Sequence, residues 1–144
     1  LNISEFEILN ALGKGGFSEI RLIKYKNIDK NNIFALKTFS KVKWVRKFKG
    51  TPKQNQPKNE RDCMVSLNSC KNNWLFVTLF ATFQDAKYWY YVMQFEQGGD
   101  LMGVLFKEDT LSEDATRFYI SECSMAINEM HKMGYVHRDL KPDN

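Results

Sequence analysis

Alternating apolar and polar residues dominate the first forty positions of the chain. Three segments share this period of two, and their apolar members are Phe6, Ile8 and Ala11; Phe17, Ile20, Leu22 and Ile23; and the apolar residues of 33–39. A period of two is typical of strands with one buried face, so three antiparallel strands are predicted. The mostly polar residues 27–32 form the predicted turn between the last two.

Two further strands and a helix are predicted before residue 96. Residues 75–84 and 88–95 are rich in aromatic and β-branched side chains, and a short turn at 85–87 separates them. Pro57 suits the first position of a helix over residues 57–67, because its missing N–H is not needed there.

Capping residues mark the helices of the second half. Asp100 can cap a short helix that ends near residue 106, and Ser112 can cap a long helix that ends near residue 133. Gly134 then provides the stop. The apolar stripe predicted for the long helix consists of Phe118, Cys123, Ile127 and Met130.

Residues 41–58 break the periodic pattern. They contain seven Lys or Arg and no Asp or Glu, and Gly50 and Pro52 interrupt them, so a loop is predicted. A basic stretch also fits a nucleic-acid-binding module. Only Trp44 and Phe48 offer stacking surfaces and no nucleic-acid motif accompanies them, so a solvated loop is preferred and no nucleic-acid partner is expected.

The composition fits one soluble globular domain. The 144 residues are 43% hydrophobic and 26% charged, with a net charge of +4. No apolar run approaches the roughly 20 residues of a membrane span, so none is expected, and the N-terminus lacks a secretory signal pattern. Cys63, Cys70 and Cys123 fit neither a disulfide framework nor a zinc site, so reduced thiols and a cytoplasmic or nuclear location are expected.

A glycine-rich segment lies between the first two predicted strands. It reads Gly13-Lys14-Gly15-Gly16-Phe17-Ser18 and is followed by Glu19 and Ile20. Glycines in a hairpin let the backbone N–H groups approach a phosphate chain closely. They also occur for turn geometry alone, so this motif by itself is weak. Its place between two strands argues against a dinucleotide-binding loop, which needs a helix after the glycines.

A lysine ends the third apolar strand. Lys37 follows Phe34-Ala35-Leu36, and burial would disfavour its charge unless an anion were near. Glu60, in the helix predicted to begin at Pro57, could pair with Lys37 and direct it at phosphate oxygens. In isolation, a lysine at the edge of a sheet would be the simpler interpretation.

The most specific motif stands at residues 137–144. It reads His137-Arg138-Asp139-Leu140-Lys141-Pro142-Asp143-Asn144. Transfer of a phosphoryl group to a hydroxyl needs a carboxylate near the attacking oxygen, a cation for the phosphate and an oxygen ligand for magnesium. Asp139, Lys141 and Asn144 supply these groups at spacings of two and five residues.

These motifs, in this order, resemble the eukaryotic-type serine/threonine protein kinase family over nearly the whole chain. The resemblance implies that Asp139 is the catalytic base, Lys141 steadies the γ-phosphate, Asn144 binds Mg²⁺, and Lys37 pairs with Glu60. ATP and Mg²⁺ are the implied substrate and cofactor. Ser18 departs from the family pattern, because it stands where a third glycine is usual.

The resemblance also implies how the rest of ATP is bound. Met93 would be the gatekeeper, and the backbone of Gln94 and Glu96 would hydrogen-bond adenine. Leu12, Ile20 and Ala35 would enclose the adenine ring, each of them equally compatible with plain core. Asp100 would reach the ribose hydroxyls or a basic substrate side chain.

Finer motifs resemble the AGC group of kinases, in particular the NDR/LATS branch and the related Rho-kinase and myotonic-dystrophy-kinase branches. They are Asn59-Glu60-Arg61-Asp62, Phe83-Gln84-Asp85, Gly98-Gly99-Asp100-Leu101 and Arg117-Phe118-Tyr119. Such kinases phosphorylate Ser or Thr near basic residues. The helix over residues 57–67 is the expected docking site of an activator protein. Arg138 implies control by phosphorylation of an activation segment.

The predicted fold is α+β: a five-stranded antiparallel sheet with one main helix, then the first helices of a mostly helical lobe. We expect residues 1–95 to form the first lobe, 96–99 the hinge, and 100–144 the start of the second, truncated lobe. We expect the Asp-Phe-Gly metal site to lie beyond Asn144, so this chain alone should be inactive. A pseudokinase scaffold is the main alternative to an active kinase.

Overall fold

A computed structural model describes residues 1–27 and 33–144 of the chain. Contacts between residues divide the chain into two compact units. The first unit comprises Leu1–Asn68 and Val77–Phe95, and the second comprises Ser69–Phe76 and Glu96–Asn144. Each unit is described by itself below.

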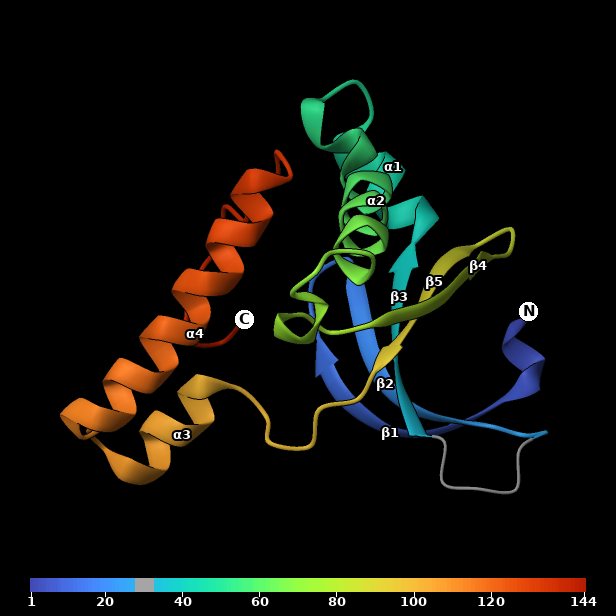
Figure 1. The fold of residues 1–144 in the computed structure, drawn as a ribbon. Helices are drawn as coiled ribbons and strands as arrows, with labels where there is room; N and C mark the ends of the chain where they lie inside the picture. The colour runs from blue at the N-terminus through green and yellow to red at the C-terminus, as the bar shows by residue number, and fades with distance from the viewer. Residues whose placement is uncertain (28–32) are drawn as a thin grey trace. The chain divides into compact units, whose positions relative to one another are not determined.

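The first unit is built on a five-stranded antiparallel sheet (Figure 1). Its strands are β1 (Phe6–Lys14), β2 (Ser18–Tyr25), β3 (Ile33–Ser40), β4 (Leu79–Gln84) and β5 (Tyr88–Gln94), in the order β1-β2-β3-β5-β4. A short 3₁₀ helix, η1 (Ile3–Glu5), precedes β1. The predicted α+β fold with a five-stranded sheet is therefore confirmed. Most of the predicted turn at 27–32 lies outside the described residues.

The alternation of side chains divides the core between the two faces of the sheet. On one face, a buried cluster is formed by Phe6, Ile23, Leu36, Tyr90 and Val92. On the other face, Phe39, Leu79 and Tyr91 form a second cluster together with Trp44 of the first helix. Because Lys37 is two residues from Phe39 on β3, its side chain shares the second face.

The segment 41–58 is helical in large part, so the predicted loop is wrong. Helix α1 (Lys41–Phe48) is followed by the 3₁₀ helix η2 (Pro52–Asn55). Ser40 caps α1, since its hydroxyl accepts a hydrogen bond from the Lys43 N–H. Trp44 is only 6% exposed, so one large aromatic residue anchors a short helix whose other positions are mostly polar.

Helix α2 (Gln56–Asn68) lies beside α1 on the same side of the sheet (Figure 1). The helix predicted over residues 57–67 is thus found, with Pro57 at its second position, where no N–H is required. The Asn68 side chain fixes the other end: its amide donates to the Leu79 carbonyl (2.7 Å) and its oxygen accepts from the Leu79 N–H (3.1 Å). The carboxyl end of α2 is therefore tied to β4.

The second unit is helical. It contains the 3₁₀ helix η3 (Asn73–Leu75), α3 (Leu101–Glu108) and α4 (Glu113–Lys132). The strand predicted to begin at residue 75 therefore begins four residues later, at Leu79. Asp100 and Ser112 cap α3 and α4 as predicted, through bonds from the N–H groups of Gly103 and Ala115.

The apolar stripe of α4 is partly mispredicted. Ile127 and Met130 are half-buried, but Phe118 is 58% exposed and Cys123 is also exposed. Tyr119, next to Phe118, is half-buried instead. The buried face is therefore rotated by about one residue from the predicted stripe at the start of the helix. Among the described residues, no helix is both long and apolar enough to cross a membrane.

Candidate active site

The glycine-rich hairpin joins β1 and β2. Its turn is closed by a hydrogen bond from the Gly15 N–H to the Ser18 carbonyl (2.8 Å). None of Gly13, Gly15 and Gly16 has a positive φ, so the backbone conformation does not itself require glycine. A Cβ added at Gly13 or Gly16 would meet no atom within 4 Å. The missing side chains leave open space beside the backbone, as close approach of a phosphate chain requires.

Lys37 and Glu60 are brought together from a strand and a helix. The Lys37 Nζ atom donates to Glu60 Oε1 at 2.6 Å, and the two side chains are 23% and 31% exposed. The ammonium also lies 5.1 Å from the centre of the Phe39 ring. The structure thus forms the ion pair predicted across 23 residues of sequence, on the half-buried face that α1 and α2 cover.

The residues predicted around adenine occupy neighbouring strands. Ala35 is 7% exposed and its register partners are Leu22 on β2 and Met93 on β5. Ile20 lies opposite Lys37. Small Ala35 therefore lies on the same face of the sheet as Lys37, two residues away. Leu12, on β1, is 44% exposed.

The residues predicted for the hinge and ribose have other hydrogen bonds. The Gln94 N–H donates to the Thr78 carbonyl at 2.9 Å, so it is not available as a donor to adenine. The Asp100 carboxylate accepts from the Gly103 N–H at 2.7 Å as the cap of α3. Glu96 and Asp100 belong to the second unit, and their contacts with a nucleotide stay a prediction.

The loop after α4 gathers the groups of the most specific motif. The Asn144 amide donates to both the carbonyl and the carboxylate Oδ2 of Asp139, at 2.7 and 2.8 Å. Lys141 Nζ lies 3.7 Å from the same Oδ2 atom. The Asp139 N–H donates to His137 Nδ1 at 3.3 Å. A carboxylate, an ammonium and an amide thus meet within one loop.

Backbone geometry shapes this loop. Arg138, immediately before Asp139, has φ 66°, a conformation that costs a non-glycine residue energy and is found mostly where the surrounding structure enforces it. The Pro142 carbonyl accepts from the Met102 N–H of α3 at 3.0 Å. The loop is therefore attached to α3 as well as to α4.

Asn144 fits the role of a single magnesium ligand. Its amide nitrogen faces Asp139, so its amide oxygen is the atom suited to a hard cation. No group of three or more His, Cys, Asp or Glu that could hold a metal occurs in residues 1–27 and 33–144. Mg²⁺ would therefore need further oxygen ligands, such as the phosphates of its nucleotide.

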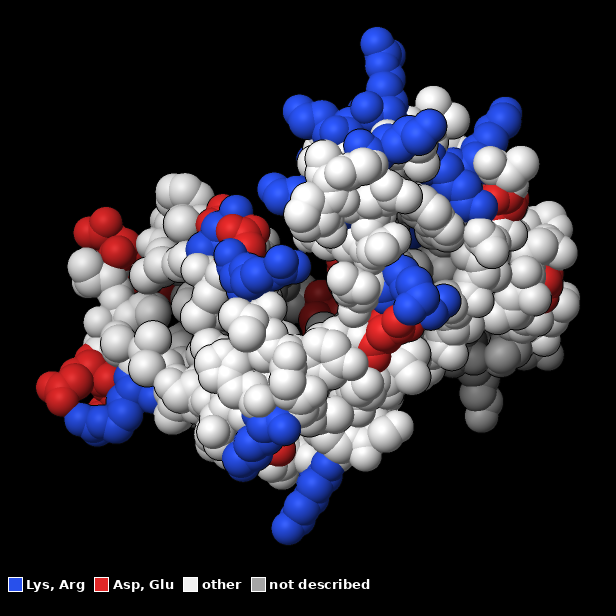
Figure 2. Space-filling model, turned by 90° about the horizontal axis from the view of Figure 1, so that it is seen from above, with Lys and Arg blue, Asp and Glu red and all other residues white. Residues whose placement is uncertain are grey.

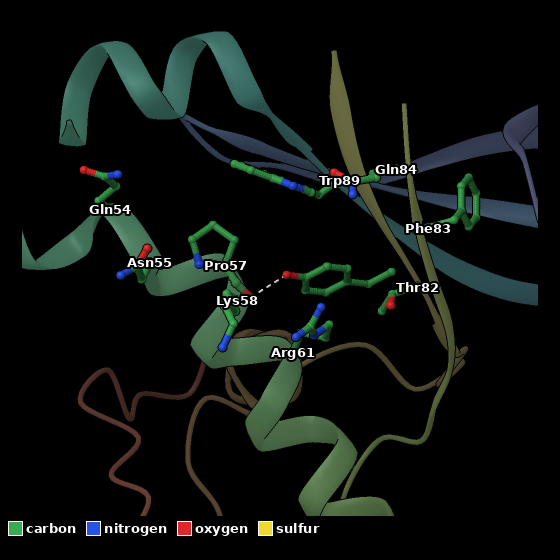
Figure 3. Close-up of a pocket in the computed structure, with 10 residues that line it drawn as sticks. Gln54, Asn55, Pro57, Lys58, Arg61, Thr82, Phe83, Gln84 and Trp89 are labelled. Carbon is green, nitrogen blue, oxygen red and sulfur yellow. Dashed lines mark hydrogen bonds between the residues drawn. The ribbon is translucent and has the colours of Figure 1, made fainter. Parts of the chain in front are cut away.

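A cavity of about 440 Å³ lies elsewhere in the first unit, between η2, the start of α2, and the strands β4 and β5 (Figure 3). Its lining residues are Gln54, Asn55, Pro57, Lys58, Arg61, Thr82, Phe83, Gln84, Trp89 and Tyr91. None of these was predicted as a nucleotide-binding residue. The sequence signal for this site was the helix over 57–67, to which Pro57, Lys58 and Arg61 belong.

Tyr91 lines this cavity and is 3% exposed. Its hydroxyl donates to the Pro57 carbonyl, the bond drawn in Figure 3. Burial, and to a lesser degree the charge of Glu60, raise the pKa of Tyr91 above its ordinary value. The same two causes raise the pKa of the Cys63 thiol. Both side chains stay protonated at neutral pH, so Tyr91 remains a hydrogen-bond donor to α2.

The fold and the site define a protein kinase, and comparison with known proteins agrees. The protein kinase domain family matches residues 6–144, and the chain belongs to this family. The chain is 44% identical to serine/threonine-protein kinase CBK1 of Pneumocystis carinii over 144 residues, all of this chain and 26% of that protein.

Two further relatives are similar over comparable lengths. The probable serine/threonine-protein kinase ndrB of Dictyostelium discoideum is 42% identical over 141 residues, 96% of this chain and 25% of that protein. Serine/threonine-protein kinase tricornered of Drosophila melanogaster is 40% identical over all of this chain and 29% of its own length. These relatives are NDR/LATS kinases of the AGC group, so the resemblance to that branch is confirmed. The chain spans about a quarter of the length of these relatives.

Proposed function

We propose that this chain is the ATP-binding and catalytic-loop part of an active serine/threonine protein kinase. The observation that supports activity most directly is the convergence of Asp139, Lys141 and Asn144 in one loop. A scaffold without activity has no need to keep all three groups in contact. Family membership alone does not favour either alternative.

Each group has a distinct role in the proposed reaction. Asp139 accepts the proton of a Ser or Thr hydroxyl while the oxygen of that hydroxyl attacks the γ-phosphorus of ATP. The bond from that phosphorus to the bridging oxygen then breaks, which releases ADP. Lys141 offsets the charge of the transferred phosphoryl group. Asn144 provides one oxygen ligand to Mg²⁺, which would neutralise phosphate charge.

The first unit supplies the groups that hold the nucleotide. Lys37, directed by Glu60, pairs with phosphate oxygens, and the hairpin N–H group of Gly16 approaches the same phosphates. Adenine lies against the sheet of the first unit, next to Ala35. This arrangement rests on the open space at the glycines and on the 2.6 Å ion pair.

Substitution of the proposed base tests the function. In the full-length protein, Asp139→Asn should reduce phosphorylation of a basic Ser/Thr peptide by a factor of at least about 10³ and leave the Kd for ATP within about twofold. Asp114→Asn on α4, where the carboxylate is 92% exposed, is the matched control and should keep full activity. Unchanged turnover in Asp139→Asn would refute the proposed mechanism.

We further propose that residues 1–144 alone do not catalyse the reaction. Asn144 is the only magnesium ligand that the family resemblance assigns within this chain, and a second ligand is expected later in the kinase sequence. Phosphorylation of the basic peptide by the purified 144-residue chain would refute this.

An activator protein is proposed to dock at the beginning of α2. The cavity beside Pro57, Lys58 and Arg61 supports this, since α2 also carries Glu60 and a ligand there could shift the Lys37–Glu60 pair. Thr82→Trp should fill the cavity. It should abolish the difference in activity between the kinase isolated from cells and the purified protein; a difference as large as that of the wild type would exclude docking here.

A cytoplasmic or nuclear location is also proposed. Cys63, Cys70 and Cys123 are free thiols, as a reducing compartment would keep them. Fractionation of cells that express the tagged full-length protein tests this, and recovery in secretory vesicles would contradict it.

A further inference from the structure

The tip of the glycine hairpin is packed against helix α1. Phe17, the residue after Gly16, places its ring 5.6 Å from the Trp44 ring and 5.1 Å from the Phe48 ring, centre to centre, in edge-to-face geometry. Trp44 and Phe48 are themselves 4.6 Å apart. Three aromatic rings thus join the hairpin tip to one face of α1.

Other contacts fix the same arrangement. The Ser40 N–H donates to the Phe17 carbonyl at 3.2 Å, and Lys47 Nζ lies 5.9 Å from the centre of the Phe17 ring. The Trp44 indole N–H donates to the Gln54 carbonyl of η2 at 3.1 Å. Trp44 therefore has a fixed orientation between η2 and the hairpin.

Helix α1 also carries a surface of basic side chains around this cluster. In Figure 2, seen from above, Lys and Arg side chains gather over the upper right part of the view, where few acidic side chains lie beside them. Lys47 and Lys53 each extend over a ring of the cluster, Phe17 and Phe48 respectively. The rings are thus partly shielded from solvent by lysine stems.

We infer that Trp44 is a positioning residue for ATP: it holds the hairpin tip, through Phe17, in the conformation that receives the phosphates. This inference rests on the proposed ATP-binding function. Gly15 and Gly16 have no side chains to restrict them, so without an anchor the tip would sample many conformations, and ordering it would weaken binding. An aromatic anchor on α1 removes part of that entropy loss before ATP arrives.

Binding measurements on the full-length protein test the inference. Trp44→Leu keeps an apolar side chain in the core but removes the ring that Phe17 contacts. It should raise the Kd for ATP between about twofold and tenfold, the range expected for loss of an aromatic pair. The Kd for adenosine, which has no phosphates, should not change. In steady-state assays KM for ATP should rise with kcat nearly constant.

Three further variants separate positioning from general damage to the fold. Trp44→Phe keeps a ring and should restore most of the ATP affinity. Phe17→Leu should weaken ATP binding as Trp44→Leu does, and the double variant should be no weaker than either, because both changes break the same contact. Val42→Ala, on an exposed position of the same helix, is the matched control and should behave as the wild type.

Different outcomes refute different statements. Equal loss of ATP and adenosine affinity, or additive losses in the double variant, would overturn the positioning role. Unchanged ATP affinity in both Trp44→Leu and Phe17→Leu would overturn it as well. Absence of ATP binding by the wild-type protein would instead overturn the proposed function, and this inference with it.

Discussion

The ion pair between Lys37 and Glu60 offers the sharpest test of how the first unit works. Glu60→Gln keeps the length of the side chain and its ability to accept a hydrogen bond from Lys37 Nζ, which is 2.6 Å away, but removes the negative charge. Lys37 would then be directed less firmly. The variant therefore tests how the Glu60 charge orients the Lys37 ammonium, while the ammonium itself is still present.

The exposure of the pair sets the expected loss of stability. Exposed ion pairs contribute roughly 0.2–1 kcal/mol, and breaking a buried pair costs about 3–5 kcal/mol. The Lys37 and Glu60 side chains are 23% and 31% exposed, so the pair is neither fully exposed nor fully buried. Because the substitution retains the hydrogen bond, the expected cost is closer to that of an exposed pair. We expect Glu60→Gln to lower the free energy of unfolding by about 1 kcal/mol, measured by urea denaturation.

The expected loss of activity is larger than the loss of stability. A hydrogen bond to a charged group contributes roughly 1.5–3 kcal/mol, so misplacing the ammonium that we propose to contact the phosphates should reduce kcat/KM for ATP by a factor of about 10 to 100. Glu113→Gln is the matched control, since Glu113 also pairs with a cation on a helix but is 88% exposed on α4. It should change kcat/KM by less than about twofold.

A double variant decides whether Glu60 acts through Lys37. Lys37→Met should reduce kcat/KM more than Glu60→Gln does, because it removes the group proposed to contact phosphate. Once Lys37 is absent, Glu60→Gln should cause no further loss of activity. Full additivity of the two losses would refute the reasoning, because it would show that Glu60 contributes to the reaction independently.

Three other changes give clear expectations. The hydrogen bond from the Tyr90 hydroxyl is the main cause that lowers the pKa of Asp85. This bond stabilises the fold fully above the ordinary Asp pKa, and the stabilisation is lost as pH falls through the lowered pKa, so Tyr90→Phe should make the urea midpoint less sensitive to acid. An unchanged dependence of the midpoint on pH would contradict this. Ser112→Ala removes the cap of α4 and should lower the free energy of unfolding by about 1 kcal/mol, whereas Ser124→Ala within α4 should not; equal urea midpoints for the two would contradict the capping role. Gly15→Ala adds a Cβ at an ordinary 3.5 Å from its neighbour, so thermal unfolding should change little while KM for ATP rises several-fold, and an unchanged KM would place the phosphates elsewhere.

The strands could be predicted because their side chains alternate regularly. The bounds of β1, β2 and β3 follow the apolar period directly. Helix α1 could not be predicted in the same way, since basic residues occupy half of its eight positions and hide the spacing of Trp44 and Phe48. Residues four apart lie on one face of a helix, so that spacing was the signal, and it was outweighed by the proline and glycine that follow.

The chemical groups of the site could be predicted more completely from the sequence than their positions in space. Asp139, Lys141 and Asn144 are within six residues of one another, so their meeting in one loop depends on little beyond local structure. The pairing of Lys37 with Glu60 depends on a tertiary contact, and was predicted from the need of a buried lysine for an anion together with the resemblance to protein kinases. The hydrogen bond from the Gln94 N–H to Thr78 could not be foreseen, because strand register decides it.

Helix α1 was not predicted, yet it explains how the glycine hairpin is held in place. A loop over 41–58 would leave the glycine hairpin with no anchor on that side, and Phe17 would be an exposed aromatic at the end of a flexible turn. A helix capped by Ser40 instead presents Trp44 and Phe48 to that ring. The stretch of sequence with the weakest structural pattern therefore provides the surface that restrains the most flexible part of the proposed ATP site. Flexibility at the glycines and rigidity at α1 are complementary, since the first lets the backbone approach the phosphates and the second limits the entropy lost when it does.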